Sequence, residues 1–286
     1  MTVVMEPGTL GRRSRRGTIP WTVVCCLIVI AMVAVLAAFG SLLTPQTPSA
    51  QDTALGMSGP SAAHWFGTDQ LGRDIFSRVM VGARTAVLGP LVVAICSALI
   101  GDVLGLLSGY FGGWVDSIIM RWVDLVWAIP SLLVIIVVAG AFGGGYWLAI
   151  GLMVLLIVPL DVRVVRGATL EQVPRPYVEA AKTLGVQNRR ILLSHIWPNV
   201  APAAVANTFL IFATALVSLS GLSYLGLGVN PGTPDWGLML SENLDLLFIS
   251  PLAALVPGLM IVLTAASMNI VGDYLFEQLS ERGVSR

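Results

Sequence analysis

Apolar residues gather into six long runs, which shorter polar segments separate. Each run holds at least 20 residues, and about 20 mostly apolar residues are enough for one helix to cross a hydrocarbon layer. The runs comprise residues 21–43, 86–108, 117–141, 146–165, 202–227 and 251–271. The pattern therefore predicts an all-α polytopic membrane protein with six transmembrane helices.

The composition supports this prediction and excludes other classes of protein. Charged residues make up 11% of the 286 residues, hydrophobic residues 56%, and the formal net charge is zero. A nucleic-acid binder needs a basic surface and a disordered chain needs low hydrophobicity, so neither class fits. The cysteines Cys25, Cys26 and Cys96 lie inside apolar runs, and only His64 and His195 could add imidazole ligands. We therefore expect no metal site, no cofactor bound by this chain and no catalytic triad.

The distribution of lysine and arginine predicts the orientation. Thirteen of the 16 basic residues lie near the termini, at position 121 or from residue 163 to residue 190, and the other three lie from residue 73 to residue 84. Cytoplasmic loops carry the excess of basic residues, so we expect both termini to be cytoplasmic. The first apolar run has 23 residues, longer than a signal-peptide core, so we interpret it as a retained helix.

The predicted organisation then follows in order along the chain. Residues 1–20 form a cytoplasmic basic tail, 21–43 the first transmembrane helix and 44–85 an extracytoplasmic loop. Residues 86–271 form a core with five transmembrane helices, which includes a cytoplasmic loop at 167–201, and residues 272–286 form a cytoplasmic tail.

The cytoplasmic loop between the fourth and fifth spans has helix punctuation at both ends. Pro176 can start a first short helix and Gly185 can end it, Asn188 is a candidate N-cap of a second, and Pro198 with Pro202 closes that one. On the first helix an aromatic residue, two alanines and a leucine recur at i, i+3, i+4 and i+7: Tyr177, Ala180, Ala181 and Leu184. This narrow face suits a helix docked in a groove of another protein, with Glu179 and Lys182 at its rim. A helix that rests on its own bundle explains the same spacing equally well.

The residues of this loop resemble a known motif. Glu179-Ala180-Ala181, three residues, Gly185, nine residues and then His195-Ile196-Trp197-Pro198 are similar to the EAA loop of ABC importer permeases, E-A-A-x3-G-x9-I-x-L-P. His195 stands where isoleucine is usual and Trp197 where leucine is usual, and we interpret His195 as structural. In that family the loop is the coupling helix, which sits in a cleft of a cytoplasmic ATPase.

Three further blocks resemble one branch of this family in the right order. Residues 64–84, 109–133 and 223–240 are similar to the C-type permease subunit of dipeptide, oligopeptide and nickel importers. The first block supplies an extracytoplasmic signature loop made of Gly67, Thr68, Asp69, Gly72, Arg73 and Asp74. Gly272 to Leu275 also match, but the rest of the tail lacks the usual ending of the family.

The resemblance implies a type I ABC importer permease fold and an ATP-driven importer of dipeptides or oligopeptides in a bacterial inner membrane. It implies three partners: a second, B-type permease, cytoplasmic P-loop ATPase subunits, separate or fused, and an extracytoplasmic binding protein. The chain contains no G-x-x-x-x-G-K-[ST] motif. We therefore expect a non-catalytic subunit whose partners use ATP and Mg²⁺.

Charged residues inside the apolar runs suggest further roles. Asp116, Arg121 and Asp124 lie near the cytoplasmic end of the third span, where they can form a gate, intersubunit ion pairs or simple internal pairs. Asp102 has no charged neighbour in the sequence. It can face a partner helix or a water-filled lumen, or it can relay protons, and an ion-coupled secondary carrier that uses Asp102 or Asp124 is the alternative function.

The outer loops also carry charge. The mixed signs of Asp69, Arg73 and Asp74 predict a rigid, self-paired loop. Asp235, Glu242 and Asp245 have no basic neighbour between residues 230 and 250, so this loop could attract a cationic group of a cargo or partner, or it could simply be an acidic outer loop.

Overall fold

Helices dominate the structure, a computed structural model that describes residues 19–248 and 250–284. In those residues the long helices are α1 (Trp21–Leu43), α2 (Ile75–Phe111), α3 (Gly113–Trp127), α4 (Ser131–Phe142), α5 (Tyr146–Gln172), α8 (Trp197–Tyr224) and α10 (Pro251–Val284). Short helical segments are α6 (Pro176–Thr183), α7 (Asn188–Ile191), a π-helical turn (Leu192–Ile196), α9 (Trp236–Glu242) and a 3₁₀ turn (Leu244–Leu246). The basic tail predicted at 1–20 lies almost wholly outside the described residues.

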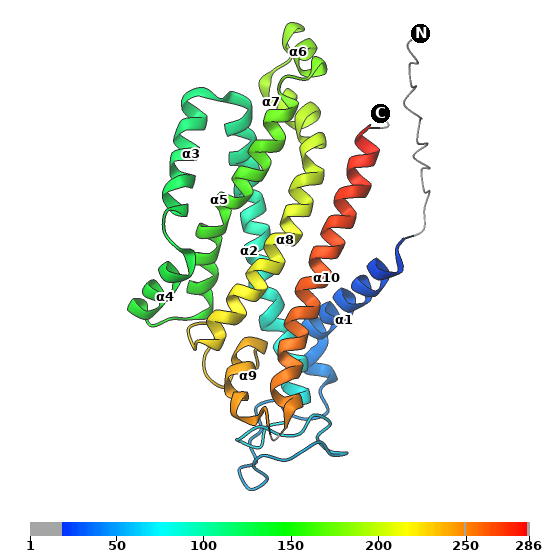
Figure 1. Ribbon diagram of the computed structural model, residues 1–286, viewed down its shortest axis with the longest axis vertical. Coiled ribbons are helices and arrows are strands. Elements are labelled where there is room, and N and C mark those ends of the chain that lie inside the picture. Colours follow the sequence, from blue (N-terminus) through cyan, green and yellow to red (C-terminus); the bar gives the residue numbers. More distant parts are fainter. Residues whose placement is uncertain (1–18, 249, 285–286) are drawn as a thin grey trace, which may run out of the picture.

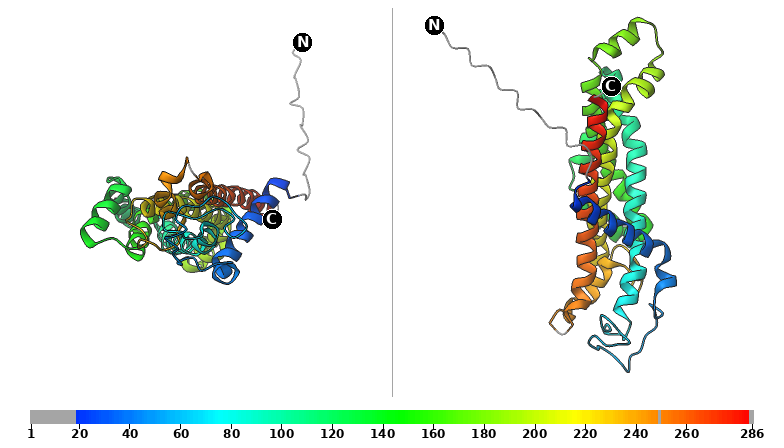
Figure 2. Two further views of the ribbon diagram at one scale, coloured as in Figure 1. Left: turned by 90° about the horizontal axis from the view of Figure 1, so that it is seen from below. Right: turned by 90° about the vertical axis from the view of Figure 1, so that its right-hand side faces the viewer.

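The long helices form an elongated bundle with α6 at one end and α9 at the other (Figure 1). Helices α2, α5, α8 and α10 run along its length, α1 crosses one edge obliquely, and α3 with α4 lies at the opposite edge (Figure 2). The largest buried apolar cluster lies between α2, α5 and α8 and includes Val93, Ile211 and Leu216. The two ends of the bundle are called the α6 end and the α9 end below.

Close packing of α2 against α5 depends on glycine. Three glycines, one helical turn apart on α2, face three residues one turn apart on α5: Gly101, Gly105 and Gly109 face Asp161, Val165 and Thr169. Small residues let two membrane helices approach closely. A side chain at any of the three glycines would collide with the facing α5 residue, so this ridge sets the distance between the two helices.

The third predicted span is broken, which corrects the expectation of one continuous helix over 117–141. Helices α3 and α4 meet at an angle of 72°, because Pro130 has no N–H to donate and disfavours helical backbone at the residue before it. Helix α3 starts directly after α2, at the α6 end of the bundle. Gly145, which lies between α4 and α5, donates its N–H to Leu227 O near the α9 end. We therefore describe α3 and α4 as one broken span, beside five continuous helices of membrane-spanning length in the described residues.

Several predicted boundaries also shift. Helix α2 begins at Ile75, so residues 75–85 of the predicted loop are helical; Asp74 Oδ2 accepts the Ser77 N–H at 2.8 Å and caps the helix. Pro198 and Pro202 do not end the second short helix, because α7, the π-helical turn and α8 follow one another without a break. Helix α10 continues to Val284 through most of the tail predicted at 272–286.

Candidate functional site

Helix α6 begins and ends at the residues that the sequence indicates. Pro176 occupies the first turn, where its missing N–H costs nothing. Gly185 follows the helix with φ of +72°, a conformation that favours glycine, and the Val186 N–H donates to Ala181 O at 3.1 Å. This is the glycine-ended hydrogen-bond pattern typical of helix C-termini, and it holds α6 as a short, well-defined helix at the tip of the bundle.

The two faces of α6 differ sharply in burial. Val178 and Ala181, three residues apart, are buried in an apolar cluster with Ile191 and Ile196. Tyr177, Glu179, Ala180, Lys182 and Leu184 are exposed, Leu184 to 82% of its surface. The predicted docking face over Tyr177, Ala180, Ala181 and Leu184 is therefore wrong at Ala181, which instead pairs with Val178 to hold α6 on its own bundle.

Polar contacts fasten the surroundings of α6. The Tyr177 hydroxyl donates to Gln172 Oε1 at 2.8 Å and accepts from Asn199 Nδ2 at 3.3 Å. Lys182 Nζ lies 5.2 Å from the centre of the Tyr110 ring, a cation–π contact with the end of α2. Lys182 thus has an interaction partner in Tyr110. Glu179, by contrast, has no ion-pair partner in the described part of the chain.

The α6 end is continuous with the membrane helices. Helix α7 leads through the π-helical turn directly into α8, and the Val178 cluster also contains Leu106 of α2 and Val165 of α5. His195 lies inside the π-helical turn, where its Nδ1 is 3.3 Å from Arg190 O. A displacement of α6 therefore has two routes into the bundle, along the backbone to α8 and through side-chain packing to α2 and α5.

The α9 end carries a cluster of ion pairs, called the arginine cluster, made of Asp69, Arg73, Arg78 and Glu242. Arg73 Nε donates to Asp69 Oδ2 at 2.6 Å, and Arg73 Nη2 donates to Glu242 Oε2 at 2.9 Å. Arg78 is fully buried, and its Nη2 donates to the same Glu242 oxygen at 2.8 Å. The cluster joins the loop before α2, the start of α2 and the end of α9.

The other residues of the predicted signature loop surround this cluster. Asp74 caps α2 and also lies 3.0 Å from His64 Nδ1. The Thr68 hydroxyl donates to Gly56 O at 2.7 Å, and Gly67 and Gly72 lie where a side chain would strike the loop backbone. The loop is self-paired, but sequence reasoning missed the contact between Arg78 and Glu242, because no local signal links residues 164 positions apart.

The acidic segment between residues 230 and 250 is mostly not available to a cation. Asp235 is buried, and its Oδ1 accepts the Leu238 N–H at 3.1 Å as the cap of α9; burial raises the pKa of this carboxyl. Glu242 binds two arginines. Only Asp245 of the three is exposed, so the structure does not support an acidic binding surface there.

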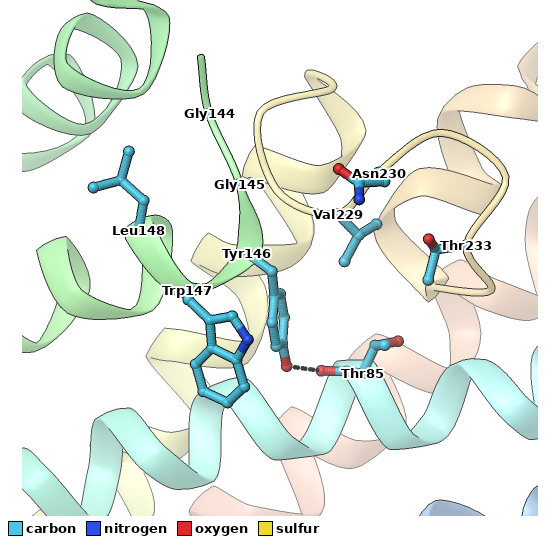
Figure 3. Close-up of a pocket in the computed structure, with 9 residues that line it drawn as sticks. All are labelled: Thr85, Gly144, Gly145, Tyr146, Trp147, Leu148, Val229, Asn230 and Thr233. Atoms are coloured by element: carbon cyan, nitrogen blue, oxygen red, sulfur yellow. Dashed lines mark hydrogen bonds between the residues drawn. The ribbon is translucent and has the colours of Figure 1, made fainter. Parts of the chain in front are cut away.

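A cavity of about 480 Å³ opens beside the α9 end (Figure 3). Its lining is uncharged and consists of Thr85, Gly144, Gly145, Tyr146, Trp147, Leu148, Val229, Asn230 and Thr233. The Tyr146 hydroxyl points to α2 and donates to Thr85 O at 2.5 Å. Aromatic rings and neutral polar groups together suit an uncharged polar ligand or a peptide backbone better than an ion.

Two ion pairs join α3 to α5. Arg166 binds Asp116 through two hydrogen bonds of 2.6 and 2.7 Å, and Arg163 binds Asp124 at 2.6 Å. Arg121 is exposed and has no such pair in the described residues. Asp102, alone in the sequence, lies beside Asp161 of α5. The described residues contain no group of three or more metal-ligating side chains.

Comparison with known proteins places these features in a family. Residues 101–283 match the model of the family described as "Binding-protein-dependent transport system inner membrane component". The glutathione transport system permease protein GsiD of Pectobacterium atrosepticum is 38% identical over 78% of this chain and 74% of its own length. The dipeptide transport system permease protein DppC of Alkalihalophilus pseudofirmus is 34% identical over 90% of this chain and 84% of its own.

Solved structures agree on the fold. A chain from inward-facing conformations of the MetNI methionine ABC transporter superposes with a TM-score of 0.58, at 16% identity, over 71% of this chain and 96% of that chain. At this identity the likeness shows the fold alone, which is that of the type I ABC importer permeases.

Proposed function

Because the chain belongs to the family of binding-protein-dependent transport system inner membrane components, we propose that it imports short peptides as one of two permeases in an ATP-driven complex. It is a multi-pass permease subunit of an ABC importer of the peptide and glutathione type. The similar relatives are permeases of glutathione, dipeptide and D,D-dipeptide systems, which favours dipeptides or oligopeptides as cargo. The partners would be a B-type permease, P-loop ATPases that use ATP and Mg²⁺, and an extracytoplasmic binding protein.

The orientation in this proposal places α6 in the cytoplasm and α9 outside. Arg175, Lys182, Arg189 and Arg190 surround α6, as expected for a cytoplasmic loop. Helix α10 ends at the α6 end of the bundle (Figure 1), which puts the C-terminus on the same side as α6. The arginine cluster then belongs to an outer cap, and the uncharged cavity of Figure 3 opens on the side from which cargo arrives.

The observation that carries the proposal is the division of α6 into a buried and an exposed face. The buried face holds α6 against α2, α5 and the start of α8. The exposed face offers Leu184 as an apolar anchor. It also offers Glu179, which has no ion-pair partner among the described residues. This combination suits a helix seated in a groove of a soluble partner. An ATPase that closes on this face would displace α6 and, through it, α8.

A charge reversal on the exposed face tests the proposal. We expect Glu179→Lys to lower two quantities: the amount of ATPase that co-purifies with the permease, and the ATP-dependent uptake of peptide into proteoliposomes. Each should fall at least about tenfold, which corresponds to a loss of about 1.4 kcal/mol of binding free energy. Gln187→Lys places the same side chain at an exposed residue beyond α6 and should leave both quantities unchanged. Gly185→Asp should impair both as well, because it also strains the helix end.

Two outcomes would contradict the proposal. Uptake and ATPase recovery that are equal in wild type, Glu179→Lys and Gly185→Asp would show that α6 is not the coupling helix. Uptake that continues without any ATPase and follows an ion gradient would favour the ion-coupled carrier.

A further inference from the structure

Two carboxyl side chains lie side by side in the apolar interior of the bundle. Asp161 on α5 is fully buried, and Asp102 on α2 lies within hydrogen-bonding reach of it. The approach is close because Gly101 faces Asp161, and a side chain at position 101 would collide with Asp161 Oδ2. The two residues therefore meet at the point where α2 and α5 pack most tightly.

The hydrogen bonds around this pair are incomplete. Asn207 on α8 donates its Nδ2 to Asp161 Oδ1, which accounts for one oxygen. Asp161 Oδ2 and Asp102 Oδ1 are both buried and have no hydrogen-bond partner among the described residues. Ionised carboxylates offer only acceptors, whereas a protonated carboxyl has one O–H to donate. One proton between the two side chains would satisfy both orphaned oxygens.

Within residues 19–248 and 250–284, no basic side chain forms an ion pair with Asp102 or Asp161. The nearest basic residues along α5 are Arg163 and Arg166, which bind Asp124 and Asp116 of α3. Helix α8 contributes the neutral Asn207. The remaining charge from α10 is a further carboxylate, Asp273, which lines a cavity of about 500 Å³ together with Asn207. Two adjacent carboxylates in an apolar site repel each other strongly unless one of them is protonated.

We propose that Asp102 and Asp161 form an intramembrane proton-binding site in which the two carboxyls share one proton and fasten α2 to α5 and α8. A metal ion fits less well, because the described residues provide no group of three or more metal-ligating side chains.

The site makes the bundle sensitive to pH in a defined direction. A buried acid that keeps its proton to a higher pH in the folded state than in the unfolded chain stabilises the folded state fully only where both states are protonated. That contribution falls as the pH rises and is gone once the folded state has released its proton. Loss of the proton leaves two negative charges at the α2–α5 contact and weakens it.

The test uses the full-length chain, purified in detergent with any subunits that accompany it. We expect the wild-type thermal unfolding midpoint to fall as the pH is raised. Asp102→Asn and Asp161→Asn should each remove most of that fall, because an amide supplies the N–H in place of the O–H and never ionises. Asp273→Asn is the matched control, since it removes a carboxyl of α10 that is not part of the pair, and it should keep the wild-type profile.

Infrared spectroscopy tests the proton directly. The wild type should show the carbonyl band of a buried carboxylic acid. The variant Asp102→Asn, at a half-buried position, should lack it. A band that persists in both single variants, or pH profiles that are equal in wild type and Asp102→Asn, would overturn the proposal. A third outcome would also overturn the proposal, in favour of a metal ion. In it, sodium but not choline restores the thermal unfolding midpoint at high pH, and does so in the wild type but not in the variants.

Discussion

At the scale of single residues, one carboxylate holds two arginines in the outer cap. Glu242 Oε2 accepts hydrogen bonds from both Arg73 and Arg78, and Arg78 is fully buried. A buried charge that loses its partner costs far more than the pair itself contributes. Glu242 therefore stabilises the cap mainly because its loss would leave Arg73 and Arg78 without this carboxylate partner.

We expect Glu242→Gln to destabilise the protein by about 3 kcal/mol, the low end of the range for a broken buried pair, because its side chain is 24% exposed. Asp245→Asn, which changes an exposed carboxylate in the same segment, should be neutral. Chemical unfolding in detergent measures both variants. Equal unfolding midpoints for wild type and Glu242→Gln would show that the cluster does not hold the cap together.

At the scale of elements, the short helices at the α6 end owe their stability to contacts with the bundle, because they are too short to be stable alone. Helix α6 has eight residues and α7 has four, and isolated helices this short are unstable in water. Val178 supplies the main apolar contact of α6, with no exposed surface. The loop therefore keeps its shape only while Val178 stays buried.

We expect Val178→Asp to release α6 and α7 and to speed amide hydrogen exchange across residues 176–196, because it buries an unpaired carboxyl. Thr183→Asp places the same group at an exposed position of the same helix and should leave exchange nearly unchanged. Mass spectrometry of exchanged peptides makes the comparison. Equal protection in both variants would mean that Val178 does not anchor the helix.

At the scale of the whole molecule, the two ends of the bundle have different chemistry. The α6 end is basic and carries exposed short helices, whereas the α9 end is closed by the arginine cluster and the loop before α2. With α3 and α4 counted as one span, the described residues hold up to six candidate spans. The predicted orientation, with the start of α1 and the end of α10 on one side, follows from that even number.

A cysteine-labelling experiment measures this orientation in intact cells. In a background with Cys25, Cys26 and Cys96 replaced by serine, a membrane-impermeant maleimide should label Thr53→Cys from outside. It should label Thr183→Cys only after the membrane is opened. Both positions are outside the long helices. Labelling of both from the same side would contradict the predicted orientation.

The sequence by itself determined the class of protein, the positions of the long apolar helices and the position of α6. These features depend on local chemistry: apolar length for a span, and Pro176 with Gly185 for the ends of a short helix. The motif around Glu179 also predicts where the candidate coupling surface lies in the chain, and that assignment stays a prediction. Periodicity did not reveal which face of α6 is buried, because Ala180 and Ala181 are the same residue type and only the neighbouring helices distinguish them.

Only the tertiary structure decided which distant polar groups meet. Asp102 looks isolated along the chain, yet it faces Asp161; Glu242 looks like a free acid, yet it binds Arg73 and Arg78. Pairing across the bundle has no periodic signal, since it depends on helix packing that glycines such as Gly101 permit. The sequence thus specifies elements through local and solvent-driven rules, whereas charge neutralisation in a membrane bundle depends on three-dimensional proximity.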